Sequence, residues 1–116
     1  MKITLYHNPQ CSKSCESLRI LQEETNVQVS IIEYLKTPLT LVELVSIAQK
    51  LHLVPRQFMR QNDIIYQSEN LANPNLTDSD LLQAIIKHPR LLERPIAVSL
   101  NHAVIGRPPE HVLTLL

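Results

Sequence analysis

The sequence predicts an α/β domain with a four-stranded mixed sheet flanked by helices. Three observations support this fold class: a strand-helix-strand pattern at the N-terminus, a long helical stretch in the middle, and two short apolar strands followed by a helix at the end. The chain has 116 residues, 44% of them hydrophobic, which is the size of one domain and enough to bury a core. We therefore interpret residues 1–116 as a single domain.

The first third of the chain is predicted to form the strand-helix-strand unit. We expect a strand at residues 3–6, an amphipathic helix over residues 12–24, and a largely buried strand over residues 27–35, which are rich in β-branched side chains. The helix is expected to turn one face toward the core, made of Cys15, Leu18, Leu21 and Gln22. A crossover of this kind makes the two strands parallel.

Residues 38–93 are predicted to be an α-helical insertion. Thr40 and Glu43 have the spacing of a capping box and begin one helix, and Thr77 begins another. Pro55 opens a shorter helical stretch between them. No strand is expected within the insertion.

The end of the chain is predicted to form a hairpin and a short final helix. Two apolar strands, residues 95–100 and 103–105, are separated by a two-residue connection at Asn101 and His102. Gly106 is the only glycine, so we expect it where the backbone needs a positive φ or a close approach. The complete order of elements is that of a thioredoxin-like fold with helices inserted between its two halves.

Cys11 is predicted to lie in the turn between the first strand and the first helix, where thioredoxin-like folds carry their reactive cysteine. The N–H groups and the positive end of a helix favour a thiolate, and they also favour an anion that the thiolate attacks. Lys13 and His7 are expected to add positive charge nearby. The alternative is an inert buried cysteine, although Ser14 and its polar neighbours indicate a turn.

Three arginines lie beside predicted turns: Arg60, Arg94 and Arg107. Guanidinium groups bind tetrahedral oxyanions through paired N–H donors. Three such groups would neutralise a divalent oxyanion together with a thiolate. Each one taken alone could instead be a surface arginine with a solvated charge.

Four segments carry a resemblance to a known family. They are YHNPQCSKS at residues 6–14, FMRQN at 58–62, HPRLLERPIAVS at 88–99 and IGRPPE at 105–110. In this order they resemble the glutaredoxin-coupled arsenate reductase family, and most closely its bacterial arsenate-reductase-like branch. The resemblance covers essentially the whole chain.

The resemblance implies roles for individual residues. Cys11 aligns with the family's nucleophile, and its oxyanion-binding arginines align with Arg60, Arg94 and Arg107. His7 and Asn8 align with residues that flank the nucleophile, and Ser14 belongs to the same supporting segment. Pro95 is expected to be the cis proline that thioredoxin-like proteins place opposite the active cysteine.

The resemblance also implies a reaction. The thiolate attacks arsenate to form a covalent adduct, glutathione displaces that adduct as a mixed disulfide, and glutaredoxin reduces the disulfide as arsenite is released. We therefore expect arsenate or a similar oxyanion as substrate, glutathione as co-substrate, glutaredoxin as partner, no bound cofactor, and a monomeric protein.

Cys15 is a departure from the family pattern, which commonly has arginine at this position. It removes a positive charge from the first helical turn and supplies a second thiol one turn after Cys11. Two interpretations are open: Cys15 packs beneath the helix beside Leu18, or it resolves an oxidised Cys11.

Composition argues against several other functions. The formal net charge is zero and aromatic residues make up only 3%, which disfavours nucleic acid as a partner. The five histidines show no spacing typical of a metal site, and His88 before Pro89 is expected to end a helix. Neither a secretion signal nor an apolar run of about 20 residues is evident. A cytosolic protein without membrane attachment is therefore expected, in which cysteines are more often catalytic than structural.

Two alternatives of the same fold remain. Redox-sensing regulators that bind RNA polymerase share the Arg-Pro-Ile segment but typically carry Cys-x-x-Cys after the first strand, whereas this chain has Ser14 at the second position. A thiol oxidoreductase acting on glutathione adducts, without arsenate reductase activity, is the other.

Overall fold

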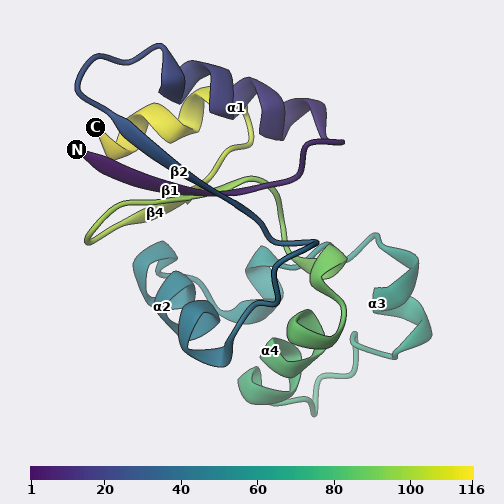
Figure 1. The fold of residues 1–116 in the computed structure, drawn as a ribbon. Helices are drawn as coiled ribbons and strands as arrows, with labels where there is room; N and C mark the ends of the chain where they lie inside the picture. Colours follow the sequence, from purple (N-terminus) through teal and green to yellow (C-terminus); the bar gives the residue numbers. More distant parts are fainter. The chain divides into compact units, whose positions relative to one another are not determined.

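The computed structural model describes all residues 1–116, and the chain separates into two compact units (Figure 1). The first unit combines Met1–Thr37 with Arg94–Leu116, and the second is Pro38–Glu93. The first unit holds the sheet and the second unit is helical.

A four-stranded mixed sheet forms the centre of the first unit, as predicted. Its strands are β1 (Lys2–His7), β2 (Gln28–Glu33), β3 (Ile96–Val98) and β4 (Ala103–Ile105), in the order β2-β1-β3-β4. Strand β1 is parallel to β2 and antiparallel to β3, which is antiparallel to β4. The C-terminal end of β1, where Cys11 follows, therefore lies at the centre of the sheet.

Strand β2 differs from its prediction. It was expected to be largely buried, but it pairs only with β1 and lies at the edge of the sheet, where Ile31 is 46% exposed. None of its six residues is fully buried. β-branched residues favour extended backbone in both edge and central strands, so composition could not distinguish the two positions.

The β3–β4 hairpin turns one residue earlier than predicted. Its connection was placed at Asn101 and His102, but the N–H of Ser99 donates to the His102 carbonyl oxygen at 2.8 Å, which closes the turn around Leu100 and Asn101. The Ser99 hydroxyl also donates to that oxygen, at 3.1 Å. This hydroxyl accepts the His102 N–H in return, so the side chain of Ser99 adds to the pairing.

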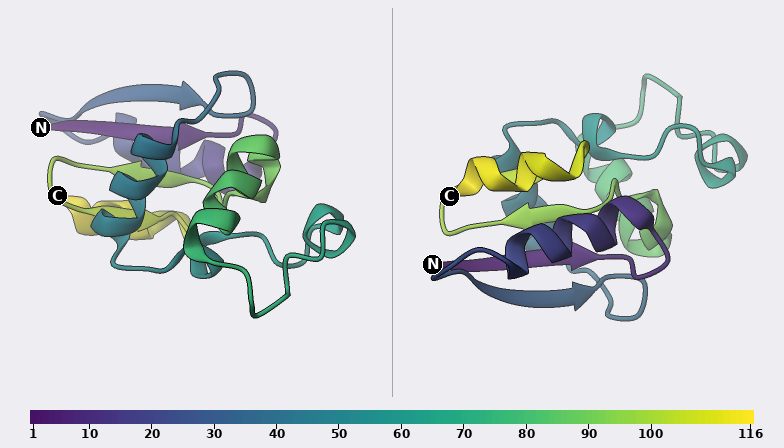
Figure 2. Two further views of the ribbon diagram at one scale, coloured as in Figure 1. Left: turned by 90° about the horizontal axis from the view of Figure 1, so that it is seen from below. Right: turned by 90° about the horizontal axis from the view of Figure 1, so that it is seen from above.

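Helix α1 (Ser12–Gln22) and the 3-10 helix η3 (Pro109–Leu115) cover the same face of the sheet (Figures 1 and 2). The core between them and the sheet consists of Ile3, Leu5, Leu21, Ala97, Val112 and Leu115. The buried residues of α1 are Ser14, Ser17 and Leu21. The prediction that Cys15 and Gln22 face the core is therefore wrong, because small serines occupy the tightest positions instead.

Gly106 explains why a small side chain is needed on α1. A Cβ atom at Gly106 would lie 2.5 Å from the Ser17 Oγ and 2.7 Å from the Pro95 Cγ. Its φ is not positive, so the close approach is the reason for glycine at this position. Gly106, which directly precedes Arg107, is thus in direct contact with α1.

Replacing Gly106 by alanine is expected to lower the free energy of unfolding by about 1–3 kcal/mol, because the added methyl group overpacks this contact. The midpoint of urea unfolding measures the change. In a Ser17→Ala background the loss should be smaller, since one of the two clashing atoms is gone. An unchanged midpoint for Gly106→Ala would contradict the packing described.

The second unit contains helices α2 (Leu41–Leu51), α3 (Ile64–Ser68) and α4 (Asp78–Lys87), with 3-10 helices η1 (Pro55–Phe58) and η2 (Pro89–Leu91). Helix α4 packs against α2, η1 and η2. The capping box of Thr40 and Glu43 is present, and a second one begins α4 at Thr77. Helix α4 ends at His88, as predicted. The short helix α3 had no separate prediction, since five residues carry little periodic signal.

No helix in the chain has both the length and the apolar character that crossing a bilayer requires.

Candidate active site

Cys11 is the N-cap residue of α1, directly after the turn that follows β1. Its backbone is extended, with φ −102° and ψ 123°, and its N–H donates to the Asn8 carbonyl oxygen at 3.0 Å. The residue is partly exposed. This position does not match an inert buried cysteine, because the thiol is accessible to a small reactant.

The surroundings of Cys11 favour its thiolate. Burial by itself raises the pKa of the thiol, but the N–H groups of Ser14 and Lys13 and the positive charges of Arg94 and Arg107 together outweigh it. The pKa of Cys11 therefore lies below its ordinary value. Lys13 acts here through its backbone N–H, in contrast to the side-chain charge predicted for it.

Arg107 places its guanidinium beside the thiol of Cys11. Its Nη2 lies 4.0 Å from the Cys11 Sγ, and its Nε donates to the Arg94 carbonyl oxygen at 2.9 Å. The hydrogen bond to the backbone fixes the orientation of the guanidinium plane. The N–H groups that make no hydrogen bond within the protein remain able to donate to an anion beside the sulfur.

Arg94 and Arg107 each precede a cis proline. The Arg94–Pro95 bond is cis, as predicted, and the Arg107–Pro108 bond is also cis, which the sequence analysis did not anticipate. Both arginines are partly buried in the first unit, the unit that contains Cys11.

His7 and Ser14 form a buried polar contact behind the cysteine turn. The Nδ1 of His7 and the Oγ of Ser14 are 2.6 Å apart, and the Asn8 N–H donates to the same Oγ at 3.0 Å. Burial lowers the pKa of His7, with Glu33 opposing, so the ring is neutral at pH 7. The prediction that His7 adds positive charge near Cys11 is therefore wrong. The hydrogen bond between the His7 Nδ1 and the Ser14 hydroxyl holds the first turn of α1.

Cys15 is exposed, and its thiol donates to the Pro9 carbonyl oxygen at 3.3 Å. The interpretation that it packs beneath the helix beside Leu18 is therefore wrong. Leu21 and the two buried serines occupy the inner face of α1, which leaves Cys15 on the outer face.

Arg60 belongs to the second unit, unlike the other two predicted arginines. Its N–H donates to the Leu91 carbonyl oxygen at 2.7 Å, and its Nη1 lies 3.5 Å from the Asp63 Oδ2. The Nη1 also donates to the Arg90 carbonyl oxygen at 3.3 Å. Within its unit, Arg60 is thus held by one carboxylate and by the backbone that follows α4.

Asp63 is a residue that the sequence analysis missed. Its side chain is only 1% exposed, accepts from the Ile65 N–H at 2.9 Å and from the Arg90 Nε at 3.0 Å, and caps α3. Burial by itself raises the pKa of Asp63, but these hydrogen bonds and the charges of Arg90 and Arg60 lower it overall. An aspartate directly before the apolar pair at residues 64–65 was the N-cap signal that could have identified it.

Replacing Asp63 by asparagine is expected to lower the free energy of unfolding by about 1–3 kcal/mol at pH 7, because it removes the buried carboxylate charge that pairs with Arg90 and Arg60. The folded-state pKa of Asp63 lies below the unfolded value of about 3.9, so the carboxylate stabilises the fold fully above that value. This contribution is lost as the pH falls through the folded-state pKa. Urea unfolding at several pH values checks it: the difference between wild type and variant should shrink below about pH 4, and a constant difference would contradict this.

The sequence profile of the ArsC family matches residues 6–115. The chain belongs to the ArsC family. An arsenate reductase of Haemophilus influenzae is 46% identical over 117 residues and covers 100% of both chains. An arsenate reductase of Neisseria meningitidis is 44% identical over 116 residues, covering 99% of this chain and 98% of its own.

Solved structures agree with this assignment. An arsenate reductase of Vibrio cholerae has a TM-score of 0.96 and 41% identity, and covers 100% of this chain and 98% of its own. A putative arsenate reductase of Yersinia pestis has a TM-score of 0.91 and 42% identity, and covers 97% of this chain and 98% of its own. The predicted fold class and the resemblance to arsenate reductases are both confirmed.

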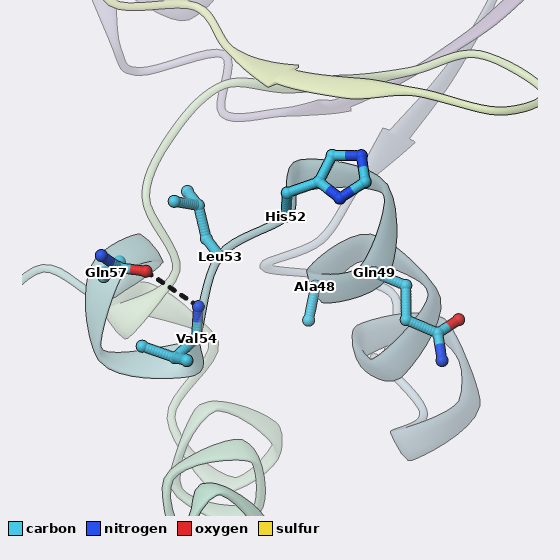
Figure 3. A pocket seen from close by; sticks show the side chains of 6 residues that line it. All are labelled: Ala48, Gln49, His52, Leu53, Val54 and Gln57. Carbon is cyan, nitrogen blue, oxygen red and sulfur yellow. Dashed lines mark hydrogen bonds between the residues drawn. The ribbon is translucent and has the colours of Figure 1, made fainter.

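The ArsC chain also has a hollow of about 470 Å³ in its second unit (Figure 3). It is lined by Ala48, Gln49, His52, Leu53, Val54 and Gln57. The Gln57 side chain accepts from the Val54 N–H at 2.9 Å and so holds one wall. None of the predicted site residues lines this hollow, and no three histidine, cysteine or acidic side chains anywhere in the chain are grouped to hold a metal ion.

Proposed function

We propose that this ArsC-family protein is an arsenate reductase that uses glutathione and glutaredoxin. The observation that carries the proposal is the thiol of Cys11 at the start of α1, with the Arg107 guanidinium 4.0 Å from its sulfur. Full-length relatives named arsenate reductases, at 44–46% identity, support the substrate.

The first step is attack of the Cys11 thiolate on arsenic. A sulfur–arsenic bond forms, and an arsenate oxygen leaves as water after taking up protons. Arg94 and Arg107 hold the oxyanion and stabilise the charge that develops during attack. Each charge-assisted hydrogen bond contributes about 1.5–3 kcal/mol before the cost of desolvation.

The second step transfers two electrons to arsenic. The glutathione thiolate attacks the Cys11 sulfur, the sulfur–arsenic bond breaks, and its electron pair remains on arsenic, which becomes arsenite. The product on the protein is a mixed disulfide between Cys11 and glutathione. Glutaredoxin then reduces this disulfide and restores the free thiol, so no bound cofactor is needed.

Arg60 is retained as a third oxyanion-binding residue in the proposal, on the resemblance of the FMRQN segment alone. His7, Asn8, Ser14 and Pro95 are proposed as supporting residues. Within the first unit, the contact of His7 and Asn8 with Ser14 positions the Ser14 N–H, which stabilises the thiolate. The proposal includes a monomer in the reducing cytosol, where both cysteines remain free thiols.

An assay coupling arsenate reduction to NADPH oxidation through glutathione, glutaredoxin and glutathione reductase tests the proposal. We expect NADPH oxidation that depends on arsenate and on both thiol components. Phosphate and sulfate should inhibit the reaction competitively, since they present similar oxyanion faces to the arginines but are not reduced. Absence of arsenate-dependent oxidation would overturn the proposal, and reduction of a glutathione mixed disulfide without arsenate would favour the thiol oxidoreductase instead.

A further inference from the structure

A second accessible thiol lies one helical turn after the proposed nucleophile. The Cys15 N–H donates to the Cys11 carbonyl oxygen at 3.0 Å, so the two residues span the first hydrogen-bonded turn of α1. Residues spaced this way have Cβ atoms about 5–6 Å apart, whereas a disulfide needs about 3.5–4.5 Å. Joining the two sulfurs therefore requires the first turn of α1 to rearrange so that the two Cβ atoms move closer together.

The side chain of Cys15 points toward the cysteine turn. Its thiol donates to the carbonyl oxygen of Pro9, two residues before Cys11, and helical side chains generally lean toward the N-terminus in this way. Its exposed position leaves it no role in the core. The contact with Pro9 instead holds the sulfur next to the segment that carries the nucleophile.

The first turn of α1 has an exposed outer face, on which Cys15 lies, and a buried inner face. Cys11 makes no side-chain capping hydrogen bond, and its extended backbone is not locked in helical geometry. Ser12 and Lys13, which directly follow Cys11, are exposed to solvent. Ser14 in the same turn is buried and bound to His7 and Asn8, so the rearrangement is confined to the exposed outer face, where few buried contacts oppose it.

We infer that Cys15 is a resolving thiol for a mixed disulfide on Cys11. The Cys15 thiol loses its proton to solvent, and its sulfur attacks the Cys11 sulfur. The bond between Cys11 and glutathione breaks as the bond between Cys11 and Cys15 forms, and glutathione leaves as a thiolate that takes up a proton. This exchange involves no net oxidation or reduction.

The resulting disulfide requires two electrons from a dithiol reductant, as thioredoxin-type proteins supply. The inference rests on the proposed function, which places glutathione on Cys11, and it extends that function by a second class of electron donor. A family member with Cys11 as its single thiol depends on a reductant specific for glutathione mixed disulfides. In this chain the Cys11–Cys15 disulfide offers a dithiol protein a second route to restore the Cys11 thiol.

Mass spectrometry of the intact protein after treatment with oxidised glutathione tests the inference. Wild type is expected to form the Cys11–Cys15 disulfide, detected by the loss of two hydrogen atoms and by a peptide joining the two residues. Cys15→Ser should instead retain one glutathione on Cys11, and its release should be at least tenfold slower. A matched control, Cys15→Ser combined with Arg19→Cys, moves the second thiol one turn further along α1 and should also retain glutathione.

Three results would overturn the inference: retention of glutathione by wild type for as long as by Cys15→Ser, a disulfide between two chains in place of the internal one, or resolution by the Arg19→Cys control. The treatment uses no arsenate, so its outcome is independent of turnover. Exchange without arsenate-dependent NADPH oxidation would defeat the proposed function alone, whereas Cys11-dependent turnover without the internal disulfide would defeat this inference alone.

Discussion

Cys11→Ser is expected to abolish arsenate-dependent NADPH oxidation. A serine hydroxyl remains protonated at neutral pH and cannot form the mixed disulfide through which two electrons reach arsenic. The variant should fold normally, because Cys11 is partly exposed and makes no side-chain cap with α1. Steady-state rates in the coupled assay give the measurement, with the urea unfolding midpoint as a test of folding.

Ser12→Ala is a matched control for Cys11→Ser, since it changes the exposed neighbour in the same turn. It should leave the rate within about twofold of wild type, as surface substitutions usually do. Residual arsenate-dependent turnover in Cys11→Ser would contradict the assignment of the nucleophile.

Arg107→Gln is expected to lower kcat/KM for arsenate by about 100-fold to 1,000-fold, the range for losing one donor that stabilises charge in a transition state. It removes the guanidinium whose Nη2 is 4.0 Å from the Cys11 sulfur. It should also raise the pKa of Cys11, because Arg107 is one of the two positive charges that lower it. Arg107→Lys should recover only part of the activity, since an ammonium lacks the planar pair of donors.

Arg19→Gln is the matched control for Arg107→Gln. Arg19 lies on the same helix as the cysteine turn but forms ion pairs with Glu16 and Glu23 at the surface. Exposed ion pairs of this kind contribute little to stability, so neither kcat/KM nor the pKa of Cys11 should change appreciably. A comparable loss of activity in both variants would show that Arg107 has no specific role.

Local patterns predicted most of the fold. The first strand and helix, the capping box at Thr40 and the end of α4 at His88 depend on short segments, and all are present. Features that depend on neighbours in space were predicted poorly. The edge position of β2 is set by which strands pair, and the inner face of α1 is set by the close approach of Gly106.

The site was predictable to different degrees. The position of Cys11 follows from the local strand-to-helix pattern, whereas the pairing of Arg107 with a residue 96 positions earlier could be expected only from the family resemblance. The charge of His7 was predicted wrongly because its burial, which lowers its pKa, depends on the tertiary structure. The exposure of Cys15 was missed for a related reason: helical spacing does not identify the face that packs.

The titration of Cys11 tests most directly the central claim, that α1 and two arginines hold this sulfur as a thiolate. In the Cys15→Ser protein, which has one thiol, ultraviolet absorbance of the thiolate is followed against pH. The structure predicts a midpoint below that of an ordinary free thiol measured under the same conditions, and a higher midpoint when Arg107→Gln is added. A midpoint at or above that value, unchanged by Arg107→Gln, would contradict the account.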